Sequence, residues 1–185
     1  MDTQATVLIV PGLRDHVTDH WQTLLEAKLN NVRAVQPLTT DKLNCRARVD
    51  NIQSEVEGID GDIILVAHSA GCLMVAHWAA TYTRSIKGAL LAAPPDINAE
   101  WPAHYPSPQE LREHGWDPTP QCRLPFPSIL AASSNDYLAS LSSASLLASA
   151  WGSQLVNLGD VGHLNPASGF GSWLLAEEFI LELDR

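Results

Sequence analysis

Basic residues are scarce in this chain: 11 lysines and arginines stand against 21 aspartates and glutamates, for a formal net charge of −10. This balance argues against binding to nucleic acid or to anionic membrane surfaces, because both need clustered positive charge. Long apolar runs are also missing, and none approaches the roughly 20 residues that a membrane-spanning helix needs. The N-terminus has no charged and then apolar leader, so we expect no signal peptide.

Cysteine is rare as well. The three cysteines, Cys45, Cys72 and Cys122, are odd in number and follow no pattern, which fits a reducing cytoplasm better than a disulfide framework. No cluster of histidine, cysteine and carboxylate residues has the spacing of a metal site. No glycine-rich phosphate-binding motif occurs either. We therefore expect a cytoplasmic protein that uses no metal and no other cofactor.

Strand-like and helix-like segments alternate along the 185 residues. This alternation predicts a single α/β domain with about six mostly parallel strands and helices on both faces. Short apolar runs predict the strands near residues 6–10, 33–37, 62–67, 87–93, 128–132 and 154–158. Helical patterns fall near residues 18–29, 44–57, 71–83, 139–150 and 171–183.

Residues 94–127 interrupt this alternation. The segment holds most of the twelve prolines together with several aromatic residues, so we expect an irregular chain with one helix around Gln109 to His114. Long irregular segments in compact domains are usually functional or disordered, and the aromatic content argues against disorder. We interpret the segment as a short cap, with Trp101 and Trp116 as walls of a substrate pocket. The alternative is a surface wrap that only covers the sheet.

The most informative motif is Ala67-His68-Ser69-Ala70-Gly71, which joins a strand-like run to a helix-like run. A serine on such a sharp turn is held out above the sheet edge. The usual pattern is G-x-S-x-G, and here Ala67 replaces the first glycine, where a methyl group can be accommodated. We predict that Ser69 is a nucleophile and that the Ala70 N–H stabilises the oxyanion. The alternative is an ordinary turn serine.

A base and an acid are expected after the serine, each on a loop that follows a later strand. His163 and Asp136 both follow strand-like apolar runs, at the sheet edge where open α/β sheets place their sites. His163 would take the proton from Ser69, and Asp136 would orient the imidazole. Asp96, which follows an earlier strand, is a rival for the acid. A surface-loop histidine is the alternative for His163.

A second oxyanion donor is expected from the loop after the first strand. That loop contains Pro11-Gly12-Leu13-Arg14, and the Leu13 N–H is our candidate. Arg14 lies beside it, and we include it among the pocket residues. Its guanidinium could pair with an anionic group of a substrate or with a carboxylate at the start of the next helix.

Four segments occur together in a pattern known from one protein family. They are Pro11-Gly12 leading to His20-Trp21, His68 to Gly71, Ser133 to Asp136, and Gly162-His163-Leu164-Asn165 continuing to Gly171. With these segments the chain resembles, over nearly its whole length, the small α/β-hydrolases related to retinoblastoma-binding protein 9. The resemblance implies a compact α/β-hydrolase fold with a six-stranded core and a triad of Ser69, Asp136 and His163. It leaves the substrate open, and it keeps a protein partner open because the name-giving relative was described through protein binding.

Two functions follow from these observations. The leading prediction is a serine hydrolase that cleaves small carboxylic esters or thioesters through an acyl-enzyme intermediate. The alternative is a protein-binding module on a hydrolase scaffold with weak or vestigial activity. An intact nucleophile, base and acid favour the enzyme, whereas the fold alone does not decide because function depends on the site.

Overall fold

The computed structural model describes residues 1–185 and contains one six-stranded sheet in which every strand pair is parallel. The strand order is β2-β1-β3-β4-β5-β6. This confirms the predicted α/β class and the number of strands. The strands are β1 (Thr6–Val10), β2 (Val32–Ala34), β3 (Ile63–His68), β4 (Gly88–Ala92), β5 (Ser128–Ala132) and β6 (Gln154–Asn157).

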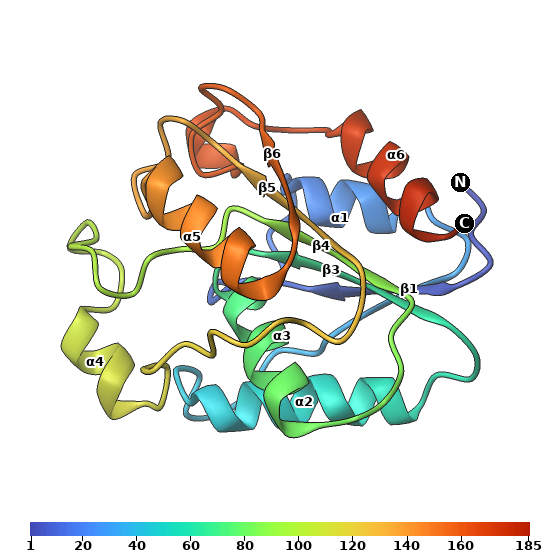
Figure 1. Cartoon of the computed structure of the whole chain (residues 1–185), viewed down its shortest axis with the longest axis horizontal. Coiled ribbons are helices and arrows are strands. Elements are labelled where there is room, and N and C mark those ends of the chain that lie inside the picture. Colours follow the sequence, from blue (N-terminus) through green and yellow to red (C-terminus); the bar gives the residue numbers. More distant parts are fainter.

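Helices cover both faces of the sheet (Figure 1), with α1 and α6 on one face and α2, α3 and α5 on the other. Each predicted helix is present. The first is shorter than expected because the His20 side chain accepts a hydrogen bond from the Gln22 N–H and so begins the helix only at Trp21. The helices are α1 (Trp21–Glu26), α2 (Cys45–Glu57), α3 (Ala70–Thr81), α4 (Pro108–Glu113), α5 (Leu141–Trp151), the 3₁₀ helix η1 (Pro166–Ser168) and α6 (Leu174–Leu183). No helix is both long enough and apolar enough to span a membrane.

The core consists of two hydrophobic clusters, one on each side of the sheet. Successive residues of a strand point to opposite faces, so that Leu65 belongs to the cluster under α2, α3 and α5, and Val66 to the cluster under α1 and α6. All residues of β3, β4 and β5 are buried. This double burial explains why these strands are continuous apolar runs in the sequence.

The strand order places a topological switch point between β1 and β3, because the chain leaves β1 on one side for β2 and then returns to β3 on the other. In open α/β sheets, ligands bind outside the carboxyl ends of strands at such a point. The loop that begins at Pro11 and the turn at Ser69 follow these two strands. The fold therefore brings the two segments with the strongest sequence signals to one edge.

Candidate active site

Ser69 lies in the turn between β3 and α3, with φ 56° and ψ −129°. A non-glycine residue with such angles carries strain of about 1–3 kcal/mol, and the surrounding structure must hold it in place. Here the Ser69 N–H donates a hydrogen bond to the Ala92 carbonyl at 2.9 Å. The turn thereby presents the Ser69 hydroxyl above the carboxyl edge of the sheet.

Small residues make this turn sterically accessible. A Cβ atom on Gly71 would lie 2.4 Å from the Val10 carbonyl oxygen and 2.9 Å from that of Pro11. Only glycine therefore lets α3 start so close to the end of β1. Ala67, which stands where the usual motif has glycine, is fully buried in the core, so its methyl group is accommodated.

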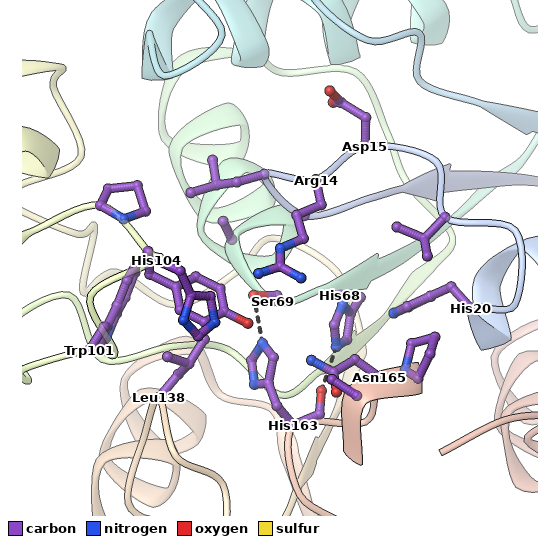
Figure 2. A pocket seen from close by; sticks show the side chains of 18 of the residues that line it. Arg14, Asp15, His20, His68, Ser69, Trp101, His104, Leu138, His163 and Asn165 are labelled. Carbon is purple, nitrogen blue, oxygen red and sulfur yellow. Dashed lines mark hydrogen bonds between the residues drawn. The ribbon is translucent and has the colours of Figure 1, made fainter. Parts of the chain in front are cut away.

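Ser69, His163 and Asp136 form a continuous hydrogen-bonded chain (Figure 2 shows the first two). The Ser69 Oγ lies 2.8 Å from His163 Nε2, and His163 Nδ1 lies 2.8 Å and 3.0 Å from the two Asp136 carboxylate oxygens. A carboxylate only accepts, so Nδ1 carries the proton and Nε2 is free to accept from the serine hydroxyl. The side chains of His163 and Asp136 are only 2% and 3% exposed.

Asp96, the rival acid, is engaged elsewhere. Its carboxylate accepts hydrogen bonds from the Asn98 N–H at 2.9 Å and from the Ser143 hydroxyl at 2.8 Å, near the start of α5. It makes no hydrogen bond with His163. Of the two carboxylates that the sequence offered, the structure places Asp136 against the imidazole.

The loop of His163 is held by the loop that carries Asp136. The Asn135 side-chain oxygen accepts from the Gly162 N–H at 2.7 Å, and the His163 N–H donates to Ser168 Oγ at 3.1 Å. Gly162 has φ +62°, and a Cβ there would lie 2.4 Å from Ser168 Oγ. A glycine before the histidine is therefore required by both backbone conformation and space.

The backbone N–H groups of Leu13 and Ala70, which line the cavity together with Ser69, make no hydrogen bond within the protein. Ala70 is the first residue of α3, where N–H groups lack partners inside the helix and the helix dipole favours negative charge. Leu13 lies in the loop that follows β1 and lines the same cavity as Ser69. These are the two groups that the sequence singled out as oxyanion donors.

Arg48 of α2 holds the Leu13 loop in place. Its guanidinium donates to the Leu13 carbonyl at 3.3 Å, to Asp15 Oδ1 at 3.0 Å and to the Lys42 carbonyl at 2.6 Å. The side chains of Arg48 and Asp15 are only 6% and 13% exposed. Sequence reasoning missed Arg48, although its position on the apolar stripe that includes Val49 and Ile52 was a signal of a buried charge with a specific partner.

A cavity of about 390 Å³ opens in front of Ser69. Arg14 and Trp101, both predicted pocket residues, line it together with Tyr105 and Leu138. The prediction that Trp116 is a pocket wall is wrong. Trp116 is fully buried in the core and is not among the residues that line the cavity, and its indole N–H donates to the Leu43 carbonyl at 2.7 Å.

Three histidine rings that line the cavity lie in succession, His20, His68 and His163, with neighbouring centroids 4.5 Å and 5.0 Å apart. Burial lowers the pKa of His20 to about 4 and also lowers the pKa of His68 well below its usual value, with His163 adding to both effects. His68 Nε2 donates to the His163 carbonyl at 2.9 Å. At neutral pH both rings are therefore uncharged, and His68 packs between His20 and His163.

A family model described as serine hydrolase matches residues 7–181, nearly the whole chain. This chain belongs to the serine hydrolase family. No curated protein sequence matches it.

Several solved structures share the fold of this serine hydrolase. A protein of Pectobacterium atrosepticum assigned as a YdeN-like hydrolase is 29% identical, with a TM-score of 0.80 over 98% of this chain and 94% of that one. The ydeN gene product of Bacillus subtilis is 18% identical, with a TM-score of 0.74 over 97% and 98% of the two chains. A thermophilic esterase of Thermogutta terrifontis is 17% identical, with a TM-score of 0.65 over 100% and 92%.

These comparisons confirm the predicted α/β-hydrolase fold and the prediction of a serine hydrolase. They support the resemblance stated above at the level of the family only. Neither the family model nor these structures connect the chain to retinoblastoma-binding protein 9 in particular.

Proposed function

We propose that this serine hydrolase cleaves small carboxylic esters or thioesters through an acyl-enzyme intermediate on Ser69. His163 is the general base and then the general acid, and Asp136 orients its imidazole. The observation that carries the proposal is the hydrogen-bonded chain from Ser69 Oγ through His163 to Asp136, with contacts of 2.8 Å at both ends, at the edge of a cavity.

The reaction would run in two steps. Ser69 Oγ attacks the acyl carbon while its proton moves to His163 Nε2, and the oxyanion accepts hydrogen bonds from the Leu13 and Ala70 N–H groups. The carbon–oxygen or carbon–sulfur bond then breaks, and His163 returns the proton to the leaving alcohol or thiol. Water then attacks the acyl-enzyme as His163 takes its proton, and His163 passes that proton to Ser69 Oγ as the bond between Oγ and the acyl carbon breaks, which releases the carboxylic acid and free Ser69.

The shape of the cavity supports small substrates. A volume of about 390 Å³ lies at the lower end of the range for small-molecule sites. Trp101 and Tyr105 contribute to its lining from the segment of residues 94–127, so we propose that this segment acts as a cap over the acyl or alcohol group. We also place the enzyme in the cytoplasm, in keeping with its three free cysteines.

Labelling with a fluorophosphonate probe, combined with turnover of para-nitrophenyl acetate, tests the proposal. Ser69→Ala should lose labelling and at least about a thousandfold in kcat, because it removes the attacking oxygen. Its stability should stay within about 1 kcal/mol of the wild type, because one hydroxyl contributes little to packing. Ser172→Ala, at an exposed serine outside the cavity, is the matched control and should keep both signals. Wild-type labelling and turnover in Ser69→Ala would refute the assignment of the nucleophile.

A further inference from the structure

Arg14 reaches into the cavity from the loop after β1. Figure 2 shows its guanidinium extending inward on the side of Ser69. The guanidinium carbon lies 5.0 Å from the centre of the Tyr105 ring, which supports it through a cation–π contact. The side chain is therefore directed at the space that a substrate would occupy.

The Arg14 guanidinium has no anionic partner in the protein, and it donates no hydrogen bond there. The carboxylate next to it in sequence, Asp15, is instead paired with Arg48 at 3.0 Å. The buried Arg48 thus takes the one carboxylate among the cavity residues, apart from the triad acid behind His163. Arg14 is left with its charge uncompensated.

The net charge of the residues that line the cavity is opposite in sign to that of the whole chain. The protein carries a formal net charge of −10. Yet the residues that line the cavity include two cations, Arg14 and Lys42, against the single carboxylate of Asp15, which Arg48 neutralises. A local positive field beside a nucleophile raises the local concentration of anionic substrates and binds them more tightly.

We propose that the substrates of this enzyme carry a free carboxylate that pairs with Arg14. This inference rests on the proposed ester or thioester hydrolysis at Ser69. The planar guanidinium presents parallel N–H donors whose spacing matches the two oxygens of a carboxylate. The substrate is thus a half-ester of a dicarboxylic acid, or an ester or thioester whose leaving group bears a carboxylate.

Two pairs of esters test this proposal on either side of the scissile bond. Para-acetoxybenzoate is compared with para-acetoxybenzamide, and the para-nitrophenyl half-ester of adipic acid with its terminal carboxamide. The two esters of each pair have nearly the same shape and differ mainly in charge. In at least one pair we expect the wild-type kcat/KM to favour the carboxylate about tenfold, the order of a charge-assisted hydrogen bond at a partly exposed site.

Arg14→Gln should bring this ratio to about one, and Arg14→Lys should keep part of it because the charge is retained. Raising the salt concentration should lower the wild-type ratio, because Arg14 is exposed and its charge is screened. Arg112→Gln on α4 removes the same charge outside the cavity and should keep the wild-type ratio. Equal ratios in the wild type and Arg14→Gln, or a preference for both carboxamides, would overturn the proposal while leaving ester hydrolysis intact.

A binding measurement separates this inference from the proposed function. If none of the four esters is hydrolysed and Ser69 is not labelled, the proposed function fails. Calorimetric titration of adipate and of para-hydroxybenzoate into the wild type and Arg14→Gln then decides about the site. Binding to the wild type that disappears in Arg14→Gln supports a carboxylate site. If the wild type binds neither compound, the proposed carboxylate site is overturned.

Discussion

The two sides of the cavity are built in opposite ways. The inner side, formed by Ser69, His163 and Asp136, belongs to turns at the carboxyl ends of strands, and the side chains of His163 and Asp136 are almost fully buried. Each side-chain nitrogen and oxygen of these three residues has a partner within 3.0 Å. The His163 ring therefore cannot turn without breaking its hydrogen bonds to both Ser69 and Asp136.

The outer side of the cavity, formed by Arg14, Lys42 and His104, lies on long loops. All three residues are exposed, and their side chains make no hydrogen bond within the protein. Loops positioned by a rigid scaffold commonly carry recognition, because they can vary without disturbing the core. Under the proposed function, the contrast teaches that the fold holds the reacting groups in place, whereas the unpaired side chains of the outer side are available to select the substrate.

Exchanging one acid on the inner side for its amide should give the largest effect. Asp136→Asn should lower kcat roughly ten-thousandfold, because an amide opposite His163 Nδ1 favours the wrong tautomer of the imidazole. Asp96→Asn is the matched control and should stay within about threefold, because its carboxylate contacts only Asn98 and Ser143. Steady-state turnover of para-nitrophenyl acetate compares the two variants. A larger loss in Asp96→Asn would transfer the role of the acid to that residue.

A smaller effect on kcat is expected from the buried Arg48, which holds the Leu13 loop in place. Arg48→Met should lower kcat about tenfold to a hundredfold with less change in KM, because a displaced Leu13 N–H weakens contacts made mainly in the transition state. It should also destabilise the fold by about 3–5 kcal/mol, because the Asp15 carboxylate loses its partner in a mostly buried place.

Two further variants show whether Arg48 acts on kcat by positioning the Leu13 loop or only by stabilising the fold. Asp15→Asn combined with Arg48→Met removes both charges, so thermal melting should recover much of the lost stability while kcat stays low. Arg46→Met removes a neighbouring arginine of α2 that is exposed and bonded to Asp50, and it should leave kcat unchanged. If the double variant recovers wild-type kcat, Arg48 acts through stability alone and does not position the loop.

The same contrast explains how far the sequence could be interpreted. Ser69 and Asp136 each follow a buried strand and His163 follows the edge strand β6, so their positions at one sheet edge were predictable from the order of elements. The role of Arg48 was not, because it depends on Asp15 in a loop 33 residues away. Trp116 was misplaced because an irregular segment gives no periodicity from which to tell its inner face. Gly115, with φ +83°, precedes Trp116, whose indole bonds to Leu43, 73 residues away.

The smallest expected effect separates the two tryptophans of residues 94–127, because one lines the cavity and the other does not. Trp101→Ala should enlarge the cavity and raise the ratio of octanoyl to acetyl ester turnover about tenfold, since a methylene contact is worth roughly 1–3 kcal/mol. Trp116→Ala should instead destabilise the fold by about 3–5 kcal/mol, as for a large core truncation, and leave the ratio unchanged. Turnover of acetyl, butyryl and octanoyl esters, together with thermal melting, measures both. A ratio that is unchanged in Trp101→Ala would mean that residues 94–127 cover the sheet without selecting the acyl group.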